Sequence, residues 1–175
     1  MTNLRIDERI DLVRNKKQLR TVALLSVVLA LLTIAAGFLF HREWDFSAIR
    51  LLVMAVGIFV YIVGHEAVHG ALMWLFSHQK PKFGISLQYA YAGSDYRFPK
   101  KQYLIIAIAP LLVWGIVLLL LALLLPSGWF WPVWIIQVQN VSGAAGDLFM
   151  FFHILRKPDQ VLIQDSGTAM TVWIA

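Results

Sequence analysis

Four segments of the chain consist mainly of apolar residues and are long enough to cross a bilayer. They cover about residues 21–40, 50–76, 103–125 and 129–155, and charged or turn-forming stretches separate them. A helix needs about 20 consecutive apolar residues for one crossing. The pattern therefore predicts an all-α integral membrane protein, a bundle of four transmembrane helices.

The first apolar segment follows a charged stretch, as the core of a signal peptide does. It is longer than the roughly 7–15 residues of such a core, and further apolar segments follow it. We therefore expect it to be retained as a helix. Since the chain has no repeats, residues 1–175 are expected to form a single membrane-embedded domain with tails at 1–20 and 156–175.

The N-terminal tail carries apolar residues at helical spacing. Ile6, Ile10 and Val13 recur among charged residues. This spacing predicts a short amphipathic helix on the cytoplasmic surface of the membrane. A solvated basic tail that only orients the protein is the alternative, and the sequence leaves both open.

A different pattern follows the second apolar segment. Larger apolar or aromatic residues alternate with smaller or polar ones over residues 83–91, residues 92–95 have the composition of a turn, and Tyr96 and Phe98 alternate again. Alternation on both sides of a turn predicts a β-hairpin over 83–98, between the second and third helices.

Lysine and arginine are unevenly distributed among the connections. Six precede the first span, two follow it, five lie between the second and third spans, none lies in the next connection, and Arg156 and Lys157 follow the last span. The positive-inside rule then makes the protein multi-pass in the cell membrane, with both termini and the 77–101 connection cytoplasmic. Four tryptophans would form an aromatic belt at the outer interface: Trp44, Trp129, Trp131 and Trp134.

Composition agrees with a membrane protein and limits its chemistry. Of 175 residues, 59% are hydrophobic and 14% are charged, and the mean hydropathy is +0.70, whereas soluble domains carry about 25% charged residues. The absence of cysteine excludes disulfides and thiolate metal sites, so any metal ligands would be His, Asp or Glu. The net charge is +5, and the lysines and arginines flank the apolar segments. We therefore assign this charge to membrane topology and expect no nucleic-acid partner.

The second apolar segment contains an HExxH motif, with His65, Glu66 and His69. Residues four apart lie on one face of a helix, so both imidazoles can reach one metal ion while Glu66 lies beside it as a general base. Ionisable groups within a membrane are costly and mark functional sites. A histidine pair hydrogen-bonded inside the bundle is the structural alternative.

A third metal ligand must come from elsewhere, and Asp147 is the other acidic residue inside a span. The second and fourth spans run in the same direction in the predicted topology. A rise of ~1.5 Å per residue then places His65, His69 and Asp147 at a common depth, roughly 10–17 Å from the cytoplasmic ends of their helices. We expect them to meet as metal ligands; a proton-relay role for Asp147 is the alternative.

Asn140, Gly143, Ala144 and Asp147 share one helical face. Asn140 could therefore hydrogen-bond a substrate backbone or a developing oxyanion. A polar contact between helices is an equally open interpretation. Asp165 in the tail could also lie near the site, although its spacing does not indicate it.

Three sequence features together resemble a family of zincin peptidases that are small bacterial membrane proteins. This family is related to the site-2 protease class of intramembrane zinc metalloproteases. These features are the Gly64–Gly70 segment around HExxH, Pro110 in an apolar span, and the segment from Asn140 to Asp147. The resemblance implies Zn²⁺ held by His65, His69 and Asp147, Glu66 as base, and cleavage of membrane-associated substrates. The chain differs from the site-2 motif in its Gly146-Asp147 order and in lacking prolines between Asn140 and Asp147.

The sequence thus predicts an intramembrane zinc metalloprotease that acts on a membrane protein or peptide. A helical substrate must unwind before cleavage, and the 83–98 hairpin offers an edge to which it could add as a strand; a surface cap is the other interpretation of that hairpin. The alternatives to an enzyme are a non-catalytic zinc-binding adaptor and a carrier of metal ions or protons.

Overall fold

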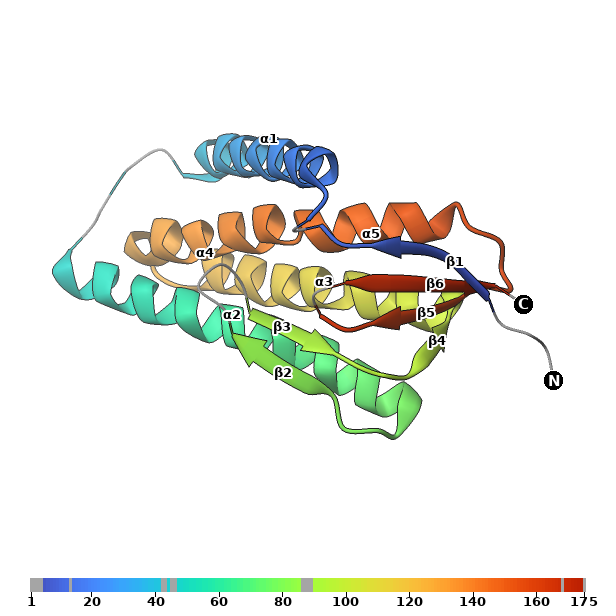
Figure 1. The fold of residues 1–175 in the computed structure, drawn as a ribbon. Coiled ribbons are helices and arrows are strands. Elements are labelled where there is room, and N and C mark those ends of the chain that lie inside the picture. Colours follow the sequence, from blue (N-terminus) through green and yellow to red (C-terminus); the bar gives the residue numbers. More distant parts are fainter. Residues whose placement is uncertain are drawn as a thin grey trace.

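The structure, a computed structural model, describes residues 5–12, 14–41, 44, 47–85, 90–167 and 169–174. Helices form most of it (Figure 1), namely α1 (Lys16–Phe40), α2 (Ala48–Ser77), α3 (Lys100–Leu124), the short 3₁₀ helix η1 (Ser127–Trp129), α4 (Phe130–Gly143) and α5 (Ala145–Leu155). The Asn15 side chain accepts hydrogen bonds from the first amides of α1, and Ser47 does the same at α2. Polar residues at the ends of the apolar segments therefore fix where these helices begin.

Within the described residues, three helices are long and apolar enough to cross a membrane, namely α1, α2 and α3. They correspond to the first three predicted spans, and they make this a membrane protein. The fourth predicted span is interrupted instead. Ala144 departs from helical geometry (φ −74°, ψ 7°) and separates α4, with 14 residues, from α5, with 11. Neither half alone reaches the length of a crossing.

The helices pack around α3 and α4. Helix α3 contacts α2, α4 and α5, while α1 lies across α4 and α5. In the contact between α1 and α4, Gly37 allows a close approach, because a Cβ atom there would lie 2.4 Å from Nε1 of Trp134. Trp131 and Trp134 are buried in this contact, so these two tryptophans form part of the protein core and differ from the predicted belt.

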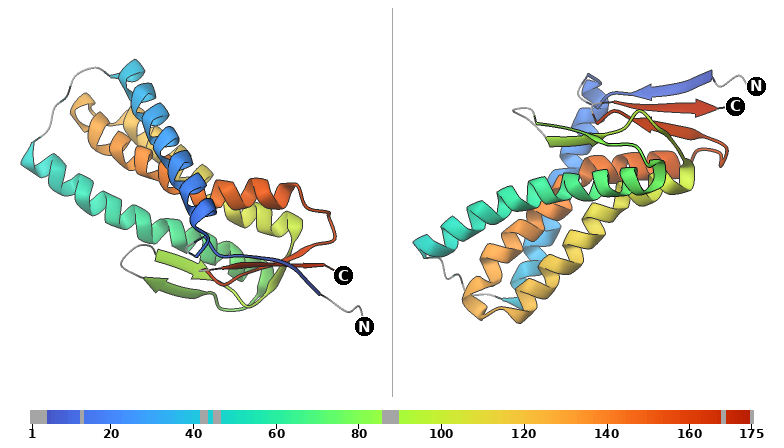
Figure 2. Two further views of the ribbon diagram at one scale, coloured as in Figure 1. Left: turned by 45° about the horizontal axis from the view of Figure 1, so that its top comes forward. Right: turned by 90° about the horizontal axis from the view of Figure 1, so that it is seen from below.

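The chain also forms a four-stranded antiparallel sheet, so the prediction of an all-α fold is wrong. Its order is β1 (Arg5–Ile10), β6 (Met170–Ile174), β5 (Leu162–Asp165) and β4 (Arg97–Pro99). Buried apolar residues of these strands, among them Ile163 and Val172, pack against α3 and α5. Figure 2 shows the strands of this sheet beside α5 (orange-red), at the end of the molecule where both termini lie.

Both predicted tails thus take part in the fold. The N-terminal tail forms the strand β1, neither an amphipathic helix nor a solvated tail; Ile10 is 1% exposed, and Val13 lies outside the described residues. The C-terminal tail forms β5 and β6. Because β1 pairs with β6, the two described ends of the chain lie at the same end of the molecule (Figure 1).

Between α2 and α3 the chain forms a second, two-stranded antiparallel sheet, but not with the predicted turn. Strand β2 (Lys82–Ile85) pairs with β3 (Ala90–Gly93), so the chain reverses between residues 85 and 90. Residues 86–89 lie outside the described part. The segment predicted as a turn, 92–95, continues β3 and leads into β4, which belongs to the other sheet. Hydrophobic alternation does not distinguish one long strand from two short ones.

Candidate metal centre

The two histidines of HExxH lie in the middle of α2 and face the interior of the protein. His65 and His69 are each 8% exposed, and their ring centroids are 5.0 Å apart. Glycines flank the motif because large rings pack against the helix there. A Cβ atom at Gly64 would lie 2.3 Å from Cζ2 of Trp114, and one at Gly70 would lie 2.3 Å from Cζ of Phe83.

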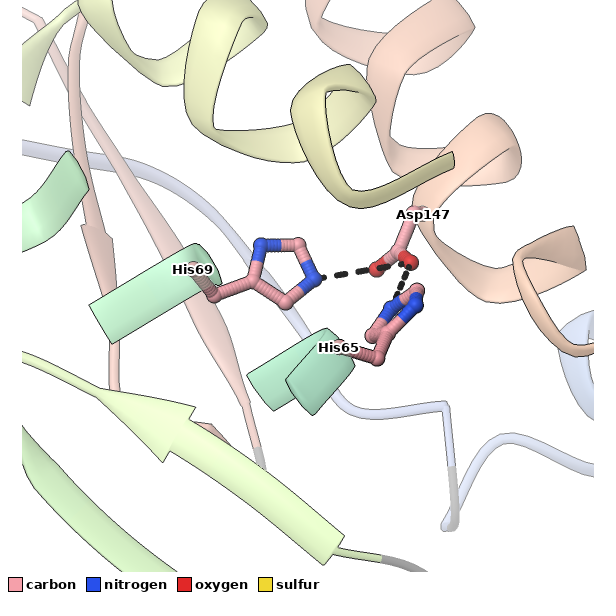
Figure 3. A group of neighbouring side chains, drawn as sticks. All are labelled: His65, His69 and Asp147. Carbon is pink, nitrogen blue, oxygen red and sulfur yellow. Dashed lines mark hydrogen bonds and ion pairs between the residues drawn. The ribbon is translucent and has the colours of Figure 1, made fainter. Parts of the chain in front are cut away.

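Asp147 reaches both histidines from another helix. Its Oδ2 lies 3.1 Å from Nε2 of His65 and 3.6 Å from Nε2 of His69, and Figure 3 shows the two rings directed at the carboxylate. The break at Ala144 places Asp147 in the first turn of α5, where the helix dipole stabilises a negative charge. The structure therefore brings together the three side chains predicted as metal ligands.

The other ring nitrogen of each histidine has its own partner. Nδ1 of His65 lies 3.0 Å from the hydroxyl oxygen of Tyr61, and Nδ1 of His69 lies 3.0 Å from the backbone oxygen of Ile106. A carbonyl oxygen only accepts, so His69 donates from Nδ1 and its Nε2 carries the lone pair when the ring is neutral. Such partners orient histidines that bind metals.

This donor set fits zinc. One ligand atom from each of His65, His69 and Asp147 can be chosen so that all lie within 4.8 Å of one another. Two imidazole nitrogens and one carboxylate oxygen are a common set for catalytic zinc, which leaves a further position for water or substrate.

Glu66 lies next to this group and lines the same cavity. Its carboxylate lies close to the backbone amide of Ala92 in β3. The cavity has a volume of about 580 Å³, and Tyr61, His65, Glu66 and Asp147 all contribute to its wall. A smaller cavity of about 140 Å³ also contains Glu66 and Asp147, together with His69. Glu66 and Asp147 therefore line both cavities, while His65 lines the larger one and His69 the smaller one.

Apolar residues of α1 and α2 form another part of the larger cavity's wall. Leu19 and Val22 of α1 and Ile62 of α2 lie on it, as do Gly143 and Met150. All of these residues except Leu19, which lies between Gln18 and Arg20, belong to apolar helical segments. The cavity thus extends from the polar group toward surfaces that suit a hydrocarbon environment.

Asp165 is a polar residue of this cavity that sequence spacing did not identify. It lies at the end of β5 and lines both cavities. Its Oδ2 accepts a hydrogen bond from the Tyr103 hydroxyl (3.1 Å), and its Oδ1 accepts one from the amide of Gly167 (2.8 Å). Burial raises the pKa of Asp165, while these hydrogen bonds oppose the increase. Only the pairing of β5 with β4 and β6 brings this residue to α3.

Asn140 lies away from the cavity. It is fully buried, and its Nδ2 donates to the backbone oxygen of Leu111 (3.2 Å) in α3. This geometry matches the polar contact between helices that the sequence left open. His153 lies outside the metal centre, and its Nε2 lies 2.9 Å from Oε2 of Glu8.

Comparisons with known proteins agree with a metallopeptidase. A family model described as "Putative zincin peptidase" matches residues 57–162, which include HExxH and Asp147. The chain is also 27% identical over 166 residues to a protein of Pyrococcus woesei named "Uncharacterized 24.7 kDa protein in gap 5'region", covering 91% of this chain and 71% of that protein. No solved structure matches the chain.

Proposed function

Since the chain belongs to the zincin peptidase family, we propose that it is an intramembrane zinc metalloprotease that cleaves membrane-associated proteins or peptides. The observation that carries the proposal is the convergence of His65, His69 and Asp147, with Glu66 and Asp147 lining both of the cavities at this group. The family implies Zn²⁺ as the cofactor, and these three residues would hold it.

A zinc ion bound there supplies Lewis acidity toward a water molecule and a peptide carbonyl. Glu66 is the proposed general base, which takes a proton from the attacking water and returns it to the leaving amine. The backbone amide of Ala92 lies close to the Glu66 carboxylate. Through their Nδ1 atoms, His65 and His69 are fixed by Tyr61 and Ile106.

The shape of the cavity supports a substrate that comes from the membrane. Part of its wall is apolar and belongs to α1 and α2, two helices long enough to span a bilayer. Leu19, Val22 and Ile62 line the same cavity as Glu66, so a peptide segment that enters from the lipid could contact them there. The carboxylates and imidazoles stand at the polar part of the same wall.

Strand β3 offers a place for an extended substrate. In an antiparallel ladder, the backbone groups of alternate residues point to opposite edges. Because the Ala92 amide points to Glu66, the backbone groups of Ala90, two residues earlier, also face away from β2. Ala90 lines both cavities. We propose that an unwound substrate pairs with β3 there, beside Glu66.

The test combines zinc content with peptide cleavage. Purified wild-type protein should bind zinc and cleave peptides derived from membrane segments. His65→Ala should lose both properties, whereas His78→Asn, at the exposed C-terminal end of the same helix, should keep both.

Glu66→Gln separates an enzyme from an adaptor or a metal carrier. The variant should retain zinc and lose about 100-fold or more in cleavage rate, a typical effect of removing a general base. Full cleavage by zinc-loaded Glu66→Gln would exclude Glu66 as the base. Absence of zinc from wild-type protein purified with zinc present would exclude the metal centre.

A further inference from the structure

Pro110 lies inside α3, is fully buried, and leaves one carbonyl of that helix without its usual donor. In an α-helix the amide of each residue donates to the carbonyl four residues earlier. Proline has no amide hydrogen, so position 110 donates nothing to the carbonyl of Ile106. Ile106 is 1% exposed. A buried carbonyl without a donor is unfavourable, so its partner must come from another element.

That partner is His69 on α2. Its Nδ1 lies 3.0 Å from the backbone oxygen of Ile106. Donation from Nδ1 leaves the lone pair of the neutral ring on Nε2. Nε2 of His69 is the nitrogen that faces Asp147, at 3.6 Å. One carbonyl therefore connects the proline of α3 with the metal-facing nitrogen of α2.

We infer that Pro110 is a positioning residue of the metal centre, because it leaves the Ile106 carbonyl open and so fixes the orientation and tautomer of His69. The inference rests on the proposed role of His69 as a metal ligand. His65 is held differently, since its Nδ1 partner is Tyr61 of the same helix.

Pro110→Ala is the direct test. An alanine at 110 has an amide hydrogen that competes with His69 for the Ile106 carbonyl. We expect zinc affinity, measured by competition with a chromogenic chelator, to fall about 10-fold, the range for the partner of a metal-binding histidine. Thermal stability of the metal-free variant should not fall, because alanine favours the helix more than proline does. A residue with only a structural role would not weaken zinc binding while the fold stayed equally stable.

Pro132→Ala is the matched control. Pro132 is also buried, but it lies in the first turn of α4, where an amide has no acceptor within the helix. The zinc affinity of the Pro132→Ala variant should equal that of the wild type. Equal affinities of folded Pro110→Ala and wild type overturn the inference, and so does an equal loss in Pro132→Ala.

A second measurement uses the wild-type protein. The chain has five histidines, so ¹⁵N spectra of metal-free protein can be assigned with single substitutions. We expect the neutral His69 ring to carry its proton on Nδ1, and the Nε2-protonated form to increase in Pro110→Ala. A wild-type His69 protonated on Nε2 overturns the inference. If the wild type binds no zinc, the metal centre is disproved, while this tautomer measurement still tests the role of Pro110.

Discussion

Oδ2 of Asp147 lies 3.1 Å from Nε2 of His65, although 82 residues separate them in the chain. Helices α2 and α5 run in the same direction (Figure 1), and the break at Ala144 places Asp147 in the first turn of α5. The carboxylate therefore completes a donor set whose other members, His65 and His69, lie on one face of a single helix.

Replacing Asp147 tests its proposed role as the third ligand. Asp147→Asn keeps the shape of the side chain but removes its charge, and we expect zinc affinity to fall by more than the roughly 10–100-fold typical of losing an outer partner. Chelator competition measures it. Asp95→Asn is the control, because the Asp95 side chain is 68% exposed and pairs with Lys82. Unchanged affinity in Asp147→Asn would mean that the third ligand is another group.

Removing the hydroxyl of Tyr61 tests the orientation of His65. Tyr61→Phe takes away the oxygen 3.0 Å from Nδ1 of His65. Zinc affinity should fall about 10-fold, and the metal-free protein should lose about 1 kcal/mol of stability, as expected for one buried hydrogen bond. Chelator competition and chemical denaturation give the two numbers. Tyr96→Phe, a tyrosine outside the cavity walls, should leave zinc affinity unchanged; a stability loss in Tyr61→Phe without weaker zinc binding would contradict the prediction.

Gly64→Ala tests the close packing beside the motif. The added Cβ atom would lie 2.3 Å from Cζ2 of Trp114, so the ring must move. We expect a loss of about 1–3 kcal/mol, typical of overpacking. Gly115→Ala is the control, since its Cβ atom would meet Nδ2 of Asn140 at 3.5 Å, an ordinary contact. Thermal unfolding in detergent compares the two variants, and equal stabilities would show that Trp114 moves freely.

The ion pairs of Glu8 in β1 with His153 of α5 and with Lys157, which follows α5, predict a stability change in acid. Burial of Glu8 tends to raise the pKa of its carboxyl, but hydrogen bonds from Lys157 and His153 outweigh burial and hold the pKa below its ordinary value of 4.5. A lowered pKa stabilises the fold above 4.5, and this contribution is lost as the pH falls through the lowered value. For a partly exposed group we expect less than about 1 kcal/mol.

Glu8→Gln should therefore be less stable than the wild type near neutral pH, and the difference should shrink as the pH falls below 4.5. Unfolding temperatures at a series of pH values measure it. Asp95→Asn serves as the control, because the side chains of Asp95 and of its partner Lys82 are 68% and 65% exposed. A difference that grows in acid would reverse the predicted sign.

The sequence by itself determined the three helices that can span a membrane in the described part of the chain, and it identified the candidate metal ligands. Continuous apolar segments follow from the solvent in which they fold, and the i, i+4 spacing of His65 and His69 follows from helical geometry. Asp147 could also be identified as a candidate ligand from the sequence, because few ionisable residues lie inside apolar segments. These are local properties of the chain, and they can be inferred without knowing which distant residues are in contact.

The tertiary structure decided what depends on distant partners. Strand β1 pairs with β6, more than 150 residues away, and neither segment carries a local pattern that identifies the other. The break at Ala144 and the reversal between β2 and β3 are likewise settled by packing. Packing also determines that the Ile106 carbonyl contacts His69 and that Asp165 lines the cavity. Hydrophobic periodicity indicates which face is buried, but a hydrogen-bond partner is fixed only when the whole chain packs.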